Sequence, residues 1–160
     1  MDVQKLKKGI KTKKGGATMN KAKVKLNDKI FIIKAKHIDT VQGFPFENDG
    51  LIHDVFRITI SNTEEIKRSF KYYGSYHNFK IGKRDFTEEE LLEIFKEFLS
   101  EAQLGDMTFE DFCDELGFST DSRRAYRSWK ACKEQLKKAL DLGIFYSELS
   151  DEPELIKEQK

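Results

Sequence analysis

Hydrophobic and polar residues alternate along much of the first half of the chain, which is typical of β-strands that bury one face. Residues 22–26 alternate in this way and place lysines on the other face, and residues 55–61 alternate with equal regularity. Residues 29–38 contain the most apolar stretch, and residues 66–73 follow a polar turn as a partner strand. We therefore predict an antiparallel sheet of three or four strands.

Two segments beside these strands have the composition of loops. Glycine, proline, asparagine and aspartate gather within residues 43–50, a combination that favours turns over a regular strand. Residues 74–84 are polar and punctuated by glycine, and only residues 78–81 have the pattern of a further short strand. We interpret both segments as loops.

The second half of the chain has the period of amphipathic helices, and the start of the first helix is well marked. Thr87 and Glu90 have the spacing of a capping box, while Phe86 and Leu91 have that of a hydrophobic staple. Apolar residues then recur at helical spacing until Gly105 ends the helix. This pattern predicts a helix that packs on the sheet.

Two more helices are expected after the first. Thr108 should cap a short helix that stops at Gly117, and a longer helix then extends to Gly143. The candidate caps of the longer helix are Ser119, Thr120 and Asp121. Its expected core stripe is Ala125, Trp129, Cys132, Leu136 and either Ala139 or Leu140. The whole pattern predicts an α+β fold, in which a three- to four-stranded antiparallel sheet is followed by, and packed against, three helices.

The composition indicates one domain with a segment on either side. At 160 residues and 38% hydrophobic content the chain can bury one core, which we assign to residues 19–146. Residues 1–18, rich in lysine and glycine, are expected to be a disordered basic arm. Alternatively they are a translated leader, because Lys14-Gly15-Gly16 can be encoded by a ribosome-binding sequence ahead of Met19. Residues 147–160 are expected to be an acidic flexible tail.

The formal net charge of +1 conceals a strong separation of charge along the chain. Residues 1–18 carry six lysines against a single acid, and residues 86–116 carry eleven acids against a single lysine. Residues 122–140 carry seven bases against a single acid. Partners must therefore be inferred segment by segment rather than from the total charge.

The sequence offers little catalytic chemistry. His37, His53 and His77 have spacings that match no metal motif, and we interpret them as ordinary surface or edge histidines. Cys113 and Cys132 fall on apolar helix faces, where a thiol behaves as a small hydrophobe, so both should be reduced. We predict no enzyme, cofactor, metal or small-molecule substrate. A loop site that uses His53 or His77 is the alternative that would allow catalysis.

The chain also lacks the features of a membrane protein. Its longest apolar run is far shorter than the ~18 residues that a membrane span needs. We therefore expect a cytoplasmic protein with no membrane partner.

The acidic helices are the first candidate binding surface. Their one-sided charge could imitate the phosphates of a nucleic acid and occupy a basic groove of a partner by electrostatic complementarity. The expected partner-binding residues are Glu89, Glu93, Glu97 and Asp114. The alternative is a solvated acidic face that has no partner.

The basic last helix is the second candidate surface. Arg124, Arg127 and Lys130 could follow the phosphates of a nucleic acid, together with the basic arm. Arginines at the start of a helix oppose the helix dipole, which implies that Arg123 and Arg124 have acidic partners. The candidate partners are Asp111, Asp114 and Glu115 of the preceding helix. A salt-bridged helical hairpin is therefore the alternative to nucleic-acid contact.

The last third of the chain also carries a recognisable run of residues. It begins Phe109-Glu110-Asp111-Phe112-Cys113-Asp114-Glu115-Leu116-Gly117-Phe118 and continues Thr120-Asp121-Ser122-Arg123. The run resembles a C-terminal signature of small uncharacterised proteins from phages, prophages and plasmids, with similarity over residues 55–142. The resemblance implies a β-hairpin followed by helices and a mobile element in a bacterial host. Because the group has no established activity, it implies no catalytic residues.

We therefore expect a non-enzymatic accessory protein of a phage or mobile element, in the cytoplasm of a bacterial host, that binds a macromolecular partner. Its most concrete form is an inhibitor of a host defence complex, in the manner of anti-CRISPR proteins. Such an inhibitor would use the acidic helical face against a host protein or ribonucleoprotein complex. The alternative is a nucleic-acid-binding or regulatory protein that uses the basic last helix and the N-terminal arm.

Overall fold

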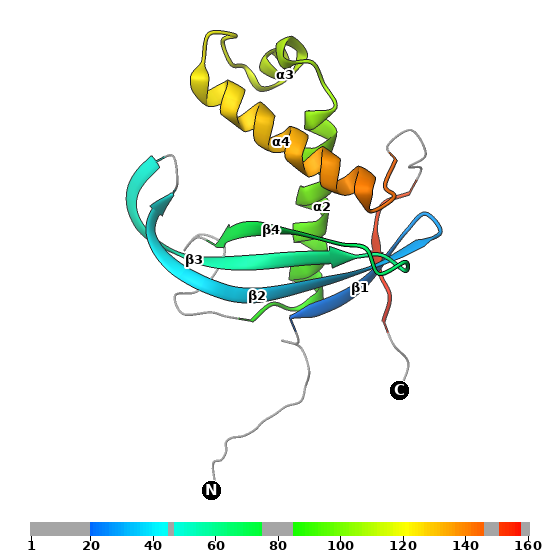
Figure 1. Ribbon diagram of the computed structural model, residues 1–160. Coiled ribbons are helices and arrows are strands. Elements are labelled where there is room, and N and C mark those ends of the chain that lie inside the picture. The colour runs from blue at the N-terminus through cyan, green and yellow to red at the C-terminus, as the bar shows by residue number, and fades with distance from the viewer. Residues whose placement is uncertain (1–19, 45–46, 75–84, 146–150, 158–160) are drawn as a thin grey trace, which may run out of the picture.

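The computed structural model describes residues 20–44, 47–74, 85–145 and 151–157. Its strands are β1 Lys21–Leu26, β2 Lys29–Phe44, β3 Glu47–Ser61, β4 Lys67–Gly74 and β5 Glu154–Leu155. Its helices are α2 Glu88–Gly105, α3 Phe109–Leu116 and α4 Arg123–Asp141. Four strands precede the helices and share a core with α2 and the end of α4, which confirms the predicted α+β fold, while α3 packs on α4 (Figure 1).

The strands form one antiparallel sheet in the order β4-β3-β2-β1-β5. Strands β1 to β4 follow one another as a meander, whereas β5 returns after α4 to pair with β1. Leu155 lies opposite Val24, and the backbone N–H of Ile156 donates to the carbonyl of Lys23 at 2.8 Å. The sheet therefore has one strand more than predicted, and this part of the expected flexible tail is held against the sheet.

A long β2–β3 hairpin stands where the sequence predicted a loop at residues 43–50, so that prediction is wrong. The ladder continues to the pair Phe44 and Glu47, with register irregularities between His37 and Asp39 and just before Phe44. Such irregularities increase local bending and twist, and the hairpin curls out of the plane of the sheet in Figure 1. The ladder that joins β2 to β3 continues through this segment despite its turn-favouring residues. The short strand predicted at 78–81 lies outside the described residues.

The first two helices begin and end as their sequence predicts. The Thr87 hydroxyl accepts the N–H of Glu90 at 3.1 Å, and the Glu90 carboxylate accepts the N–H of Thr87 at 2.8 Å, which confirms the capping box. The Thr108 hydroxyl accepts the N–H of Asp111 at 3.2 Å. Gly117 ends α3 with a φ of 77°, in the left-handed region that favours glycine.

The cap of α4 lies just beyond the predicted set. Ser122 accepts the N–H of Ala125 at 3.1 Å, so the cap is neither Ser119, Thr120 nor Asp121. The Ser119 hydroxyl instead accepts the N–H of Asp121 at 3.2 Å. It thereby shapes the turn before the helix rather than the first helical turn.

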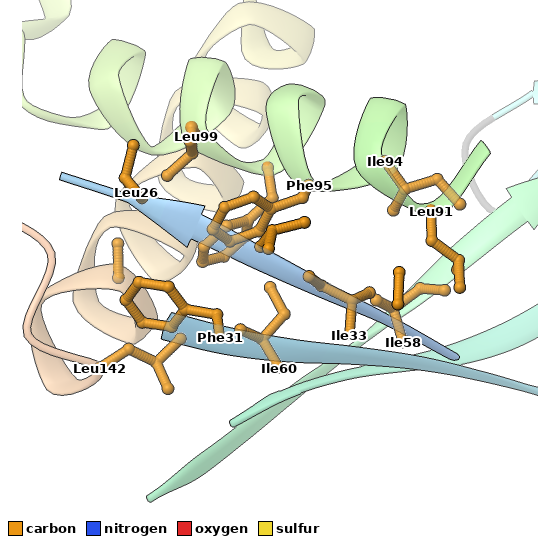
Figure 2. Close-up of a cluster of buried hydrophobic side chains, with 14 of the residues drawn as sticks. Leu26, Phe31, Ile33, Ile58, Ile60, Leu91, Ile94, Phe95, Leu99 and Leu142 are labelled. Carbon is orange, nitrogen blue, oxygen red and sulfur yellow. The ribbon is translucent and has the colours of Figure 1, made fainter. Parts of the chain in front are cut away.

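The main core lies between α2 and one face of the sheet (Figure 2). Leu91, Phe95 and Leu99 point from α2 toward the strands, and the Phe95 ring lies 5.7 Å from that of Phe31. Phe86 and Leu91, the predicted staple, are both buried in this core. The periodicity of α2 therefore identified its buried face correctly.

The helices α2 and α4 cross where Gly105 meets the backbone of Cys132. A methyl group on Gly105 would lie 2.3 Å from the Cys132 carbonyl oxygen, well inside van der Waals contact. Glycine is therefore required for this close approach. Farther along α4, Ala139 is buried whereas Leu140 is 42% exposed, so Ala139 is the core residue of the predicted pair.

A second apolar cluster, the α3–α4 cluster, holds the two last helices together. Its buried members are Phe112, Cys113 and Ala125. The indole N–H of Trp129 donates to the carbonyl of Met107 at 2.9 Å, which ties α4 to the segment before α3.

Candidate functional site

An elongated groove, here called the acidic groove, lies between β4, α2 and α4. It consists of two adjoining cavities of about 240 and 480 Å³ that share Phe70, Lys71, Glu101 and Gln135. Its acidic lining residues are Glu97, Glu101 and Glu134. Because β4 is the outermost strand on this side of the sheet, one wall of the groove is a sheet edge.

Aromatic side chains form an apolar floor in this groove. Phe70 of β4 and Phe98 of α2 stack with ring centroids 5.3 Å apart and planes 7° apart. Tyr72, two residues along β4, packs against the main core on the same side of the strand. Charges that face such a surface interact more strongly than they would in open water.

Gln135 joins the two helices across the groove. Its side chain is only 9% exposed, and its amide nitrogen donates to Glu101 Oε1 at 3.2 Å. Lys138 Nζ in turn donates to the Gln135 Oε1 at 3.3 Å. This chain of hydrogen bonds fixes the position of the Glu101 carboxylate on the groove wall.

The pKa shifts in the groove come first from burial and then from neighbouring carboxylates. Burial, followed by the charges of Glu101 and Glu93, raises the pKa of Glu97. Burial and the nearby glutamates raise the pKa of Tyr72 to about 12. Burial and Glu101 raise the pKa of Cys132 to about 11, so this thiol stays protonated at neutral pH and is a poor nucleophile. The smaller contribution of the carboxylates to each shift is the part that a bound cation would oppose.

The structure separates the four residues predicted for partner binding. Glu97 lines the groove, and Glu93 lies one turn before it and pairs with Lys96 at 3.5 Å. Glu89 pairs with Lys157 at 3.3 Å, and its pKa is lowered by a hydrogen bond to its own backbone and then by Lys157. Asp114 is exposed on α3, outside the groove. The predicted acids therefore do not form one patch.

Sequence reasoning missed Glu101, Glu134 and Gln135, which the groove brings together. Glu97 and Glu101 are four residues apart, so their shared helix face was visible in the sequence. The approach of Gln135 and Glu134 from α4 depends on how α4 crosses α2, which the sequence pattern does not specify.

The basic residues predicted for nucleic-acid binding are all exposed on α4. A cavity of about 340 Å³ at the start of the helix is lined by Arg123 and Arg127 with Tyr126 between them. The Tyr126 ring is 47% exposed, and Lys130 Nζ lies 6.0 Å from its centroid. Arg127 and Lys130 are therefore grouped around an aromatic ring.

The salt bridges expected between α3 and α4 stay a prediction. The candidate acids Asp111, Asp114 and Glu115 are all exposed on α3. Aromatic rings also join the two helices, with Phe109 5.4 Å from Trp129.

The two described histidines, His37 and His53, differ in their surroundings. His37 Nε2 lies 3.1 Å from Asp54 Oδ1, which also accepts the Thr40 hydroxyl at 3.0 Å. His53 is fully buried, so the expectation of a surface histidine is wrong there, whereas His77 lies outside the described residues. Where the structure describes the chain, no three acidic, histidine or cysteine side chains are arranged to hold a metal ion.

Comparison with protein-family models, with curated proteins and with solved structures finds no match to this chain. The resemblance to proteins of mobile elements therefore stays a prediction. None of the helices in the described ranges has the length and apolarity that crossing a bilayer requires. The proposals below accordingly depend on the geometry and charge of the chain itself.

Proposed function

We propose that this protein is a binding protein, and that its acidic groove receives a basic segment of a macromolecular partner. The observation that carries the proposal is the gathering of Glu97 and Glu101 above the stacked rings of Phe70 and Phe98. A lysine or arginine side chain of the partner would neutralise the carboxylates and lie against aromatic rings. The same cation would relieve the repulsion from Glu101 and Glu93 that adds to the effect of burial in raising the pKa of Glu97.

The edge position of β4 favours a partner segment in extended conformation. Alternate residues of an edge strand direct their N–H and C=O groups away from the sheet. The hydrogen bond from the Asn62 N–H to the Ile66 carbonyl shows which residues of β4 bond to β3 through their backbone. By this alternation the backbone N–H and C=O groups of Ser69 and Lys71 point away from β3, toward the open edge. A basic segment could therefore add a strand to β4 while its side chains reach the carboxylates of α2.

The most specific form of the proposal is an inhibitor, encoded by a phage or mobile element, that binds a host defence complex. Its support is the resemblance of residues 55–142 and the separation of charge along the chain. Proteins that handle nucleic acids present basic surfaces, and the acidic groove complements such surfaces. In this role the protein binds its target and performs no catalysis.

The proposal is tested by capture of partners from a bacterial lysate. Glu97→Gln combined with Glu101→Gln removes two charges from the groove while keeping its shape and hydrogen-bonding atoms. We expect this variant to retain about tenfold less partner than the unmodified protein. Quantitative mass spectrometry of the captured proteins measures the difference.

A matched variant removes the same charge elsewhere. Glu110→Gln combined with Glu115→Gln changes two exposed residues of α3 and should capture as much partner as the unmodified protein. If the groove variant captured the same proteins in the same amounts, the acidic groove would have no part in binding.

The exposed Tyr126 supports a second candidate function, binding of single-stranded nucleic acid at the start of α4. Bases stack on aromatic rings while neighbouring arginines contact phosphates, and here Tyr126 lies between Arg123 and Arg127. Under this function, binding of an oligonucleotide would be abolished by Tyr126→Ala and weakened by loss of Arg127.

A further inference from the structure

The solvent face of the sheet is strongly basic, and apart from Lys71, which also lines the acidic groove, neither proposed function uses it. Burial alternates along β1, β2 and β3, so one face packs on α2 and the other is open to solvent. In Figure 1, α2 lies behind the strands, away from this second face. Its basic side chains, here called the basic sheet face, are Lys21, Lys23, Lys25, Lys34, Lys36, Arg57, Lys67 and Lys71.

Strand register places several of these cations directly opposite one another. Lys36, Arg57 and Lys71 form one row across three strands, and Lys21 lies opposite Lys34. Opposed side chains in a sheet have their Cβ atoms about 5 Å apart, inside the Debye length of about 8 Å at physiological ionic strength. Salt therefore does not remove the repulsion within these rows.

The surrounding residues compensate little of this charge. None of the eight cations forms an ion pair with a side chain in the described ranges. The described acids in register with this face are Glu154, opposite Lys25, and Asp39, opposite Val55, and both lie at its margins. The centre of the face therefore has a positive potential that no described acid neutralises.

Protection of sheet edges does not account for this pattern. Lysines on edge strands discourage pairing with other chains, which is a sufficient reason for cations on β4. Lys34 on β2 and Arg57 on β3 each have a paired residue in the neighbouring strand on both sides. Like charges opposite each other in the middle of a sheet oppose folding, so a function outside the fold has to explain them.

We infer that the basic sheet face binds nucleic acid through its phosphate backbone, without preference for base sequence. A phosphate chain supplies a regular series of anions that matches rows of cations. The hydroxyls of Thr59 and Ser69, which follow Lys34 in register across the sheet, are hydrogen-bonded to each other at 3.0 Å, which leaves one hydroxyl proton of the pair to donate to a phosphate oxygen. Tyr73, opposite Val55, is the one aromatic residue in register on the described part of this face, and it lies at the margin, so contacts at the centre fall on the backbone.

The test measures binding of the full chain to a fluorescein-labelled single-stranded oligonucleotide by fluorescence anisotropy, at about 50 and 200 mM salt. Lys34→Gln, Lys36→Gln and Arg57→Gln are combined in one variant, and Lys71 is left unchanged because it also lines the acidic groove. We expect about tenfold weaker binding at the lower salt concentration. The slope of the logarithm of the binding constant against the logarithm of the salt concentration should fall in magnitude by about two to three. Its melting temperature should equal or exceed that of the unmodified protein, because repulsion is removed.

A second variant removes the same number of charges from α4, by Arg124→Gln, Arg127→Gln and Lys130→Gln. It should change affinity by less than about threefold. Equal losses in both variants would mean that only net charge matters, and a larger loss in the α4 variant would assign binding to α4. Either result would overturn the inference, as would no binding by the unmodified protein at low salt.

Vesicles containing anionic lipid test whether the basic sheet face binds a membrane surface instead of nucleic acid, since both carry many negative charges. Vesicle binding that depends on the basic sheet face, without oligonucleotide binding, would overturn the inference in favour of a membrane surface. These measurements are independent of the acidic groove, because the Glu97→Gln and Glu101→Gln variant should bind the oligonucleotide at least as well as the unmodified protein.

Discussion

The main core and the α3–α4 cluster differ in how they are built. The main core joins strands and α2 across long distances in sequence, and rings such as Phe31 and Phe95 are completely buried in it. The α3–α4 cluster joins two neighbouring helices, and Tyr126 on its surface remains 47% exposed. A cluster of local contacts with partly exposed rings opens more readily than a shared core. The comparison therefore separates the part that defines the fold from a part that can adapt to a partner.

The largest expected effect comes from the point where the two regions are joined. Gly105→Ala places a methyl group 2.3 Å from the Cys132 carbonyl oxygen, so α4 must move away from α2. We expect the free energy of unfolding to fall by about 3 kcal/mol, as in a severe case of overpacking. Urea denaturation followed by circular dichroism measures this change.

Gly117→Ala is the matched control for this substitution. A methyl group at Gly117 meets no atom within 4 Å, and only the φ of 77° opposes it. The expected loss is about 1 kcal/mol. If both alanines destabilised the protein equally, the close approach at Gly105 would not be what joins the two regions.

A smaller and local effect is expected within the α3–α4 cluster. Trp129→Ala removes the hydrogen bond to the Met107 carbonyl and the ring contact with Phe109. We expect a loss of about 2 kcal/mol, because the indole is only half-buried. Amide hydrogen exchange should accelerate over residues 109–116 and stay unchanged in β2 and β3.

Trp129→Phe sharpens this prediction, since it keeps an aromatic ring and removes only the N–H donor. Its exchange rates should lie between those of the unmodified protein and the alanine variant. Faster exchange throughout the sheet would show instead that the two regions unfold as one unit.

The smallest expected effect concerns the acidic groove, which borders both regions. Because the folded state raises the pKa of Glu97 above its ordinary value of 4.5, the folded protein binds the Glu97 proton more tightly than the unfolded chain. Stability attributable to Glu97 is then present below about pH 4.5 and is lost as the pH rises through the raised pKa. Glu97→Gln should therefore stabilise the protein at neutral pH by a few tenths of a kcal/mol, since solvent screens the exposed carboxylate.

Denaturation of Glu97→Gln at about pH 4.5 and pH 7 measures this contribution. Glu110→Gln, on the exposed surface of α3, removes one charge outside the groove as a control. A Glu97→Gln variant that was less stable than the unmodified protein at neutral pH would contradict the raised pKa of Glu97.

Features that depend on neighbouring residues were predictable from the sequence. The capping box of Thr87 and Glu90 and the stop at Gly117 are set by side chains within one turn of the helix end. The buried face of α2 followed from its period alone. These elements and the α+β class needed no knowledge of tertiary contacts.

Features that depend on pairing between distant residues were not predictable in the same way. The fifth strand exists because residues 154–155 pair with β1, which is far away in sequence, and the β2–β3 hairpin is long because its ladder begins as far back as Ile32 and Ser61. The acidic groove needs Gln135 of α4 beside Glu101 of α2, and the basic sheet face needs Arg57 opposite Lys36. Each lysine-bearing strand was visible in the sequence, but the register that aligns the charges was not.

The pairing of β5 with β1 also has a consequence for how the chain acquires its structure during synthesis. Strand β1 is made early, yet its partner at residues 154–155 leaves the ribosome on the order of ten seconds later at ordinary elongation rates. During this interval the outer edge of β1, with Val24 in its middle, is available to other chains. The alternating lysines of β1 then act as a safeguard for the nascent protein, since their mutual repulsion discourages two unfinished copies from pairing there.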